Sequence, residues 1–417
     1  MNHTPHATRA QLLGVTLGNA LEFYDFLVFS FFAVQIGQCF FPAASAQTSL
    51  LAALATFGAG FIMRPLGALV IGGLGDRIGR RPMLLLSFAL IGCANLGVAI
   101  TPSYAALGIA APLIVLACRL VQGFALGGEV GASTAFLSEV AAPARRGRTI
   151  ALQFVGQGAA LLAGGAIGVG LAAVFDDRAL AVWGWRIAMG IGVLIVPIGL
   201  ILRGTLPETL PERAPAPAEP QRYVRVALFA LATMLSGTIC TYVLNYMTTY
   251  AKTVLKLPSS ISFGATIAVG AGFVIGAVLG GIGSDRFGRR PMMLWPGAIG
   301  TALTLPGFWL LTAAPSATTL YAVSFVLRLV TVLAMTAAFV SLTEAFPPRI
   351  RSGSVAVLYA VATSVFGGTT QFIVAWLTGV TGDPLSPAYY MFAASLLGVV
   401  AAAMSRETAP NLRSPRA

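Results

Sequence analysis

The sequence has 417 residues, of which 57% are hydrophobic and 10% are charged, and its formal net charge is +12. A soluble domain of this size carries about 25% charged residues, so the composition excludes an ordinary soluble protein. Most of the arginines lie in short segments between apolar runs, and they form no separate basic domain. This distribution argues against a nucleic-acid partner despite the net charge.

Apolar runs of about 20 residues recur along the chain and are typical of transmembrane helices. The first half is predicted to hold helices at 12–40, 48–74, 82–101, 105–138, 149–174 and 185–203. The second half is predicted to hold helices at 224–251, 261–283, 291–313, 318–345, 353–378 and 386–404. The fold class is therefore an all-α integral membrane protein with twelve transmembrane helices in two six-helix halves.

The segment 204–222 is rich in proline and polar residues, which indicates a semi-rigid linker. The predicted domains are an N-terminal six-helix bundle over 1–203, the linker, and a C-terminal six-helix bundle over 223–417 with a short tail. Most lysines and arginines fall on the side of the membrane that also holds both tails and the linker. By the positive-inside rule, both termini are expected in the cytoplasm of a bacterial-type inner membrane.

A glycine-rich basic stretch occurs twice, over 72–82 and over 280–291. Asp76 matches Asp285 at an offset of 285 − 76 = 209 residues, half the chain length, which indicates two related halves. Gating roles are expected for these two loops and for the acidic and basic residues at two further helix ends. The expected gating residues are Asp76, Arg77, Arg80, Arg81, Glu139, Arg145, Asp285, Arg286 and Glu344.

Acidic residues within the first predicted helix are candidates for proton coupling. Asn19, Glu22 and Asp25 follow one another at intervals of three, so adjacent members are neighbours along a helix. Buried carboxylates in a membrane span need partners or a cavity, and two this close disfavour ionisation of both. Proton coupling is expected at Asp25, then Glu22, then Glu129. The alternative is that these carboxylates pair with arginines and only hold helices together.

Three arginines fall inside predicted spans, where each needs a counter-charge and favours an anionic substrate. Arg119 is followed at i+3 by Gln122, and Arg328 repeats Arg119 at the 209-residue offset. For Arg64 a structural pairing with a carboxylate is favoured over contact with substrate, and for Arg119 the alternative is a static salt bridge. The expected substrate-binding set is Asn19, Arg119, Gln122, Gln157, Tyr242, Asn245 and Arg328, with aromatic packing as the alternative for Tyr242.

The repeated glycine-and-arginine loop resembles the signature loop of the major facilitator superfamily of transporters. Gly18-Asn-x-x-Glu-x-x-Asp-Phe26, Phe61-x-x-Arg-Pro-x-Gly67 and Arg119-x-x-Gln-Gly123 resemble motifs of its metabolite–proton symporters. Gly184-Trp-Arg186 does as well, and Leu342-Thr-Glu344 is similar to the citrate and tricarballylate members. The resemblance implies import of a tricarboxylate with protons by alternating access. It also implies that Arg119 is the cation nearest to Glu22 and Asp25, and that one of these two carboxylates pairs with it when substrate is absent.

Several alternatives remain open. The substrate could instead be another organic acid, such as α-ketoglutarate or shikimate, or a zwitterionic osmolyte such as proline or betaine. A proton-driven drug exporter would favour aromatic and acidic pockets over buried arginines. Cys39, Cys93, Cys118 and Cys240 show no metal-ligand spacing, and the sequence has no nucleophile–base set or cofactor loop. An enzyme, a metal site and a cofactor are therefore not expected, and the expected partners of the monomer are a small carboxylate, protons and lipid.

Overall fold

The computed structural model describes residues 8–78, 80–127, 137, 140–204, 224–346 and 348–409. These residues form helices and contain no β-strand, which confirms the expected all-α class. Glu129, Glu139 and the predicted linker beyond Gly204 lie outside the described residues. The backbones of Asp76, Arg77, Arg80 and Arg81 are helical, but their side chains are likewise not described.

The helices of the first half follow the predicted order. They are α1 (Arg9–Phe31), α2 (Ala33–Phe40), α3 (Ala46–Ile62), α4 (Arg64–Ile78), α5 (Arg80–Ile100), α6 (Tyr104–Leu107), α7 (Ala110–Gly127), η1 (Pro143–Arg145), α9 (Arg146–Val174), α10 (Asp177–Ala179), η2 (Leu180–Gly184) and α11 (Trp185–Gly204). The second half holds α12 (Val224–Asn245), α13 (Met247–Thr253), α14 (Ser259–Phe287), α15 (Arg289–Ala313), α16 (Ala317–Ala345), α17 (Pro348–Val361), η4 (Ala362–Gly367), α18 (Gly368–Thr381) and α19 (Ser386–Met404).

Ten helices of the described residues are long and apolar enough to cross a membrane. When α1 is joined with α2, α3 with α4, α12 with α13 and α17 with α18, and α5 and α11 are included, twelve long helical segments result. The predicted boundaries differ most over 105–138. There, Gly108 has a φ of 56°, a value that favours glycine, and it separates the short α6 from α7.

The break between α3 and α4 falls at Met63, directly before Arg64 and Pro65. A proline inside a helix lacks the backbone N–H and its ring clashes with the carbonyl four residues earlier, so it interrupts the helix at this point. The helix is therefore interrupted between α3 and α4. This break places Arg64 at the first position of α4, within the buried part of the bundle, with its side chain 3% exposed.

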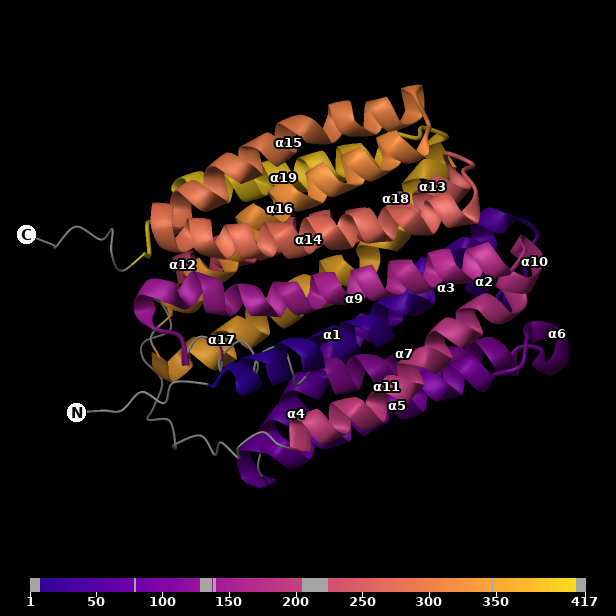
Figure 1. Ribbon diagram of the computed structural model, residues 1–417, viewed down its shortest axis with the longest axis horizontal. Coiled ribbons are helices and arrows are strands. Elements are labelled where there is room, and N and C mark those ends of the chain that lie inside the picture. The colour runs from indigo at the N-terminus through magenta and orange to yellow at the C-terminus, as the bar shows by residue number, and fades with distance from the viewer. Residues whose placement is uncertain are drawn as a thin grey trace, which may run out of the picture.

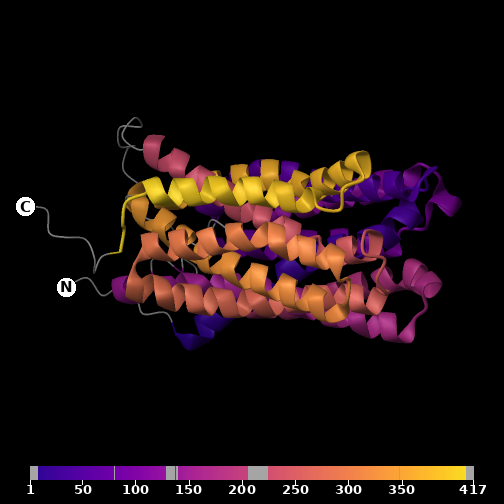
Figure 2. The same cartoon turned by 90° about the horizontal axis from the view of Figure 1, so that it is seen from above.

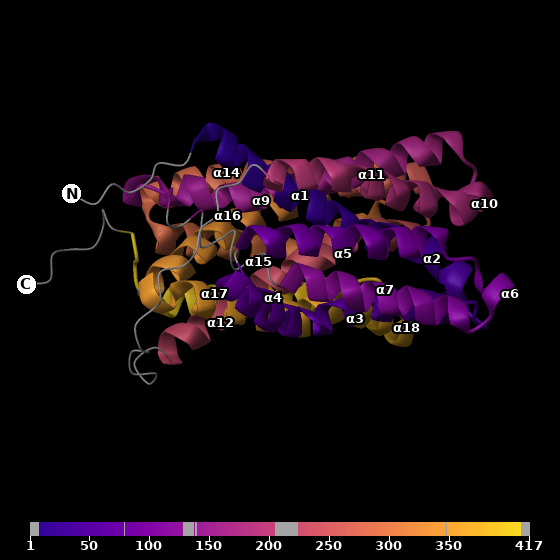
Figure 3. The same cartoon turned by 90° about the horizontal axis from the view of Figure 1, so that it is seen from below.

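The helices run roughly parallel to the long axis of the molecule (Figure 1). From above, α14, α15, α16 and α19 lie in front, whereas from below α4, α5, α7 and α11 do (Figures 2 and 3). We call the end where α1 begins and α19 ends the terminal end, and the end with α6 and α10 the distal end.

Large apolar side chains on the outer helix faces, such as Leu69, Trp295 and Trp309, are more than half exposed. Such an apolar exterior suits a protein surrounded by lipid.

Close contact between the two halves is made along α9 and α14. A Cβ atom at Gly270 would lie 2.7 Å from the backbone nitrogen of Leu162, and one at Gly158 would lie 2.9 Å from that of Val274. Small residues at these positions let the two helix backbones approach each other. This contact holds the inner faces of the two halves together, and the polar and charged side chains described next lie on helices around it.

Candidate functional site

Arg119 lies in α7 with a fully buried side chain. Its NH1 atom donates to Oε1 of Gln122 at 2.5 Å and to the carbonyl of Phe26 at 3.4 Å. Its Nε and NH2 atoms are buried and have no hydrogen-bond partner among the described residues. These two nitrogens form one edge of the guanidinium, which is the edge that a carboxylate can engage with two parallel hydrogen bonds.

Aromatic rings surround the Arg119 guanidinium. Its central carbon lies 4.3 Å from the ring centre of Phe26, 4.8 Å from that of Phe29 and 5.0 Å from that of Phe57. Arg64 packs in the same way, with its central guanidinium carbon 4.2 Å from the ring centre of Phe61. Ring faces attract a cation without neutralising it, so these arginines keep their charge available to an anion.

Arg328 occupies the related position in α16, and its side chain is fully buried too. Its NH2 atom donates to the carbonyl of Thr241 at 2.9 Å and to Oδ1 of Asn245 at 2.5 Å. Its Nε and NH1 atoms have no partner among the described residues, and Phe273 lies under it at 4.8 Å. Arg328 thus repeats Arg119 in burial, in aromatic support and in keeping unpaired donors.

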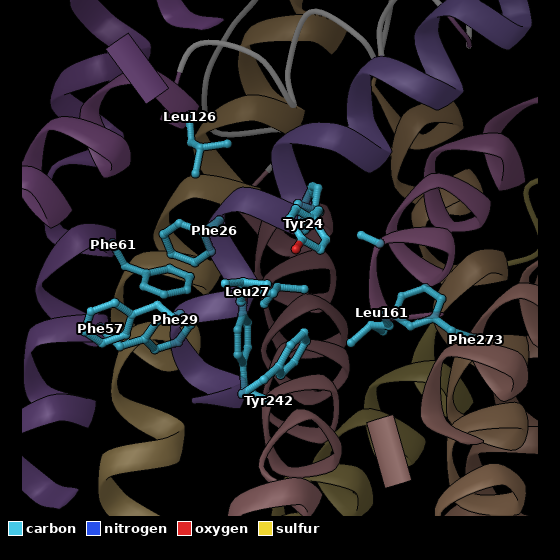
Figure 4. Close-up of a cluster of buried hydrophobic side chains, with 14 of the residues drawn as sticks. Tyr24, Phe26, Leu27, Phe29, Phe57, Phe61, Leu126, Leu161, Tyr242 and Phe273 are labelled. Carbon is cyan, nitrogen blue, oxygen red and sulfur yellow. The ribbon is translucent and has the colours of Figure 1, made fainter. Parts of the chain in front are cut away.

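Tyr242 on α12 lies between the two halves, 5.3 Å from the ring of Phe61 (Figure 4). Its phenol is close enough to interact electrostatically with Arg64, Arg119 and Arg328. It also lines a cavity of about 20 Å³, which has room for about one water molecule. Other residues lining this cavity are Gln157, Thr238, Thr241, Asn245, Tyr359 and Thr363. The predicted residues Gln157, Tyr242 and Asn245 therefore meet at one place between the halves.

Asp25 is 1% exposed and accepts a hydrogen bond from Nδ2 of Asn95 on α5 at 2.9 Å. Oδ1 of Asn95 in turn accepts from Nε2 of Gln122 at 3.1 Å, and Gln122 accepts from Arg119. Asp25 forms no direct ion pair with Arg119 among the described residues, and pairing of one of the two α1 carboxylates with Arg119 stays a prediction. The physical reason for this arrangement is that Gly192 on α11, which has no side chain, leaves room for the Asp25 carboxylate beside α5. There the carboxylate accepts its hydrogen bond from Asn95.

Asn95 is not among the site residues that the sequence motifs indicated. It is a lone amide within the apolar run of the third predicted helix, and polar groups inside membrane helices are commonly functional. That signal could have identified it, although nothing in the local pattern says which residue it meets.

Two further residues of α1 lie near this group. Asn19 donates from Nδ2 to the carbonyl of Gln153 at 2.5 Å, which ties α1 to α9. Glu22 is 1% exposed. Substrate binding by Asn19 and proton coupling by Glu22 stay predictions, as does a carboxylate partner for Arg64.

Residues 15–295 match the family model described as Major Facilitator Superfamily, and residues 217–409 match the one described as Sugar (and other) transporter. This chain belongs to the major facilitator superfamily. The solved structure of the proton:xylose symporter XylE superposes on this facilitator with a TM-score of 0.74 at 20% identity, covering 96% of each chain. At that identity the likeness concerns the fold, and it agrees with the twelve-helix arrangement.

Curated relatives match nearly the whole facilitator. The citrate-proton symporter of Salmonella typhi is 37% identical over 415 residues, which cover 96% of each protein. The alpha-ketoglutarate permease of Escherichia coli K12 is 32% identical over 87% of this chain and 85% of the permease. The proline/betaine transporter of the same organism is 29% identical over 96% of this chain and 84% of the transporter. These relatives indicate a multi-pass membrane protein.

The facilitator has a charged contact between its halves at the terminal end, which we call the terminal latch (Arg146, Asp285, Arg289, Glu344). Asp285 accepts from the backbone nitrogens of Gly147 at 2.8 Å and Arg148 at 3.1 Å, in the first turn of α9. Arg289 pairs with Asp285 at 2.9 Å and with Glu344 at 3.0 Å, and Arg146 reaches Glu344 at 3.4 Å. Asp285 thus places a carboxylate of the second half at the N-terminus of a first-half helix, where the helix dipole favours it.

The terminal latch includes two of the predicted gating residues, Asp285 and Glu344. The other two with described side chains, Arg145 and Arg286, are exposed, and the latch cations are instead Arg146 and Arg289. Arg289 could have been found, because the 209-residue offset relates it to Arg80. The choice between Arg145 and Arg146 depends on how η1 turns into α9, which the sequence does not reveal.

A second contact between the halves lies at the distal end, and we call it the distal latch (Asp177, Lys252, Ser259). Lys252 and Asp177 form an ion pair at 2.9 Å, and the Ser259 hydroxyl donates to Asp177 at 2.6 Å. The Ser259 hydrogen bond, followed by the hydrogen bond and charge of Lys252, lowers the pKa of Asp177 below its usual value of 3.8. Both ends of the facilitator therefore carry contacts between the halves in this structure.

Proposed function

We propose that this facilitator is a citrate–proton symporter that imports citrate by alternating access between its halves, 1–203 and 223–417. The observation that carries the proposal is the 37% identity to the citrate-proton symporter of Salmonella typhi over 96% of both chains. The same identity is found with the citrate-proton symporter of Klebsiella pneumoniae over 97% of this chain.

The buried arginines support an anionic substrate. Arg119 and Arg328 come from different halves, and each has two buried nitrogens without a hydrogen-bond partner among the described residues. A buried donor without an acceptor is unfavourable by about 1–3 kcal/mol, more when it is charged, so an acceptor brought by the substrate would be strongly stabilising. Citrate has three carboxylates, and we propose that different carboxylates engage the two arginines. Such binding would link the two halves beside Tyr242, which interacts electrostatically with both arginines.

Proton coupling follows from the charge that citrate brings. Moving each negative charge inward against an inside-negative potential is unfavourable by about 2.3 kcal/mol per 100 mV, so accumulation requires protons to accompany the anion. We propose Asp25 as the site that takes up a coupled proton, with Glu22 and Glu129 as the next candidates.

We also propose that the terminal end faces the cytoplasm, because most arginines of the loops belong to that end.

Uptake by purified protein in proteoliposomes tests the function. Labelled citrate, tricarballylate, α-ketoglutarate, shikimate, proline and betaine are offered with and without an inward-directed proton gradient. We expect citrate or tricarballylate to accumulate only with the gradient, and uptake to stop when an ionophore dissipates it. Preferred accumulation of α-ketoglutarate would instead favour the function of the permease relative, and preferred accumulation of betaine that of the osmolyte transporters.

Asp285→Asn is expected to slow citrate exchange about tenfold while leaving equilibrium citrate binding within about twofold. The amide can accept only one of the two α9 N–H groups and cannot pair with Arg289, so the terminal latch loses about 1–2 kcal/mol. Exchange of labelled citrate in proteoliposomes and binding in detergent provide the two measurements. Asp383→Asn is the matched control, since the side chain of Asp383 accepts from the backbone nitrogen of Leu385 in its own half. Loss of binding with a normal rate of exchange would disprove the gating role.

Asp177→Asn is expected to change the rate of citrate uptake without changing the shape of its pH profile near neutrality. The pKa of Asp177 is lowered in the closed distal latch, so the contact is fully present above the usual value of 3.8 and is lost only as the pH falls further. Uptake of labelled citrate by wild type and variant is measured across the neutral range. A pH optimum that moves in the variant would show that the distal latch contributes to the proton dependence.

A further inference from the structure

The hydrogen bonds from Arg119 to Asp25 run in a single direction. A guanidinium can only donate, so Gln122 must turn its oxygen toward Arg119 and its nitrogen toward Asn95. Asn95 must then accept on its oxygen, which leaves its nitrogen to donate to Asp25. The cation therefore determines the orientation of both amides, and the group at the far end must be an acceptor.

We propose that Asn95 is a positioning residue that couples substrate binding at Arg119 to protonation of Asp25, acting through Gln122. The proposal rests on the proposed function, since it concerns how citrate and protons are linked. We call Arg119, Gln122, Asn95 and Asp25 the relay. All four side chains are buried, and hydrogen bonds in such a chain polarise one another in the low dielectric of the interior.

The relay gives a physical route from substrate to proton. The Nε and NH2 edge of Arg119 has no partner among the described residues, whereas NH1 is engaged by Gln122. A substrate carboxylate on the unpaired edge neutralises the cation that polarises both amides. The donor at Asp25 then weakens, and a carboxylate with a weaker donor takes a proton more readily. The proton comes from the aqueous phase, binds a carboxylate oxygen of Asp25 and leaves when the substrate departs, so only an O–H bond forms and breaks.

The surroundings of Asp25 make Asn95 its main described contact. From α1 itself, Tyr24 lies within electrostatic range and Glu22 is one turn away. From α11, the neighbour is Gly192, which has no side chain to titrate. From α5, the neighbour is the amide of Asn95, and α7 contributes Arg119 through Gln122. Arg119 is therefore the charge to which described hydrogen bonds link Asp25, and that path passes through Asn95.

Asn95→Leu tests the relay, because leucine has the same branched shape and the same number of non-hydrogen atoms as asparagine but no hydrogen-bonding group in its side chain. Two transport assays in proteoliposomes separate coupling from binding: accumulation of labelled citrate driven by a proton gradient, and counterflow of citrate at equal pH on both sides. We expect accumulation to fall about tenfold and counterflow to stay within about threefold of wild type. Asn95→Gln, which restores an amide, should recover part of the accumulation.

Ser87→Ala is the matched control. Ser87 is buried on the same helix and donates to the carbonyl of Met83, so its loss removes a hydrogen bond from α5 without touching the relay. Both assays should remain at wild-type level. Gln122→Leu removes the preceding hydrogen bond of the relay. The double variant Gln122→Leu and Asn95→Leu should therefore accumulate as much citrate as whichever single variant accumulates less, because both changes interrupt the same path.

Two results would overturn the relay. One is wild-type accumulation by Asn95→Leu, and the other is an equal loss of accumulation and counterflow, which would indicate a structural role. If the wild type instead accumulates another acid of the substrate panel, the citrate proposal fails. The same variants are then measured with that acid, so failure of the relay and failure of the proposed function remain distinguishable.

Discussion

Arg119→Lys is expected to weaken citrate binding by roughly 100-fold and to abolish measurable uptake. Lysine keeps the charge but presents a compact ammonium, so it cannot offer the planar Nε and NH2 edge to a carboxylate while also donating to Gln122. Three aromatic rings shape the pocket around a flat guanidinium, and a hydrated ammonium fits between them poorly. Calorimetric titration of the purified protein with citrate measures the change directly.

Arg186→Lys provides the control for this substitution. Arg186 donates to the carbonyls of Ala99 and Thr101 at 3.0 Å each and packs 4.1 Å from the ring of Trp185. It therefore resembles Arg119 in having aromatic support, but it lies on α11 near the distal end, where it also donates from NH2 to Sγ of Cys39 at 3.8 Å. We expect citrate binding to stay within about threefold of wild type. Citrate binding by Arg119→Lys at wild-type strength would exclude Arg119 as a bidentate ligand.

Asp25→Asn is expected to abolish accumulation driven by a proton gradient while citrate exchange continues. Asparagine has the shape of a protonated aspartate and cannot ionise, so the variant corresponds to a permanently protonated carrier. Its oxygen can still accept from Asn95, which keeps the local structure intact. The two measurements are citrate accumulation with a pH gradient as the only driving force and exchange of labelled for unlabelled citrate.

Asp176→Asn serves as the control. Asp176 caps α10 by accepting from the backbone nitrogen of Ala179 at 2.7 Å, and asparagine caps helices equally well. This variant should accumulate citrate normally. If Asp25→Asn still concentrates citrate on a pH gradient alone, another carboxylate couples the proton, with Glu22 and then Glu129 as the next residues to test.

Contacts between the halves at both ends suggest how transport would proceed from this conformation. The cavity beside Tyr242 has room for about one water molecule, so it is far too small for citrate. Entry of citrate therefore requires one latch to open. The terminal latch is largely buried, whereas the Asp177 side chain of the distal latch is 73% exposed, and exposed ion pairs contribute little. We expect the distal end to open more easily from this conformation.

Much of the fold was predictable because the signals are local. Long apolar runs mark the helices, since every backbone group in lipid must bond within its own helix. The 209-residue repeat relates Asp285 to Asp76 and Arg328 to Arg119 through residue spacing alone. Arginines inside apolar runs indicated an anion site, and this signal is local too. A charge in a membrane span is unfavourable, so its presence there indicates a functional role.

Only the tertiary structure decided which of these groups meet. The sequence suggested that one of Glu22 and Asp25 pairs with Arg119, and the structure shows that Gly192 leaves room for the Asp25 carboxylate beside α5, where Asn95 donates to it. Likewise, the rotation of α9 after η1 brings Arg146 to Glu344 and leaves Arg145 exposed. Hydropathy and residue spacing determine whether a residue lies within a helix and on which face of that helix it lies. Hydrogen bonds between helices depend in addition on helix rotation and on approach to within about 3 Å, which are set by the packing of all the helices together.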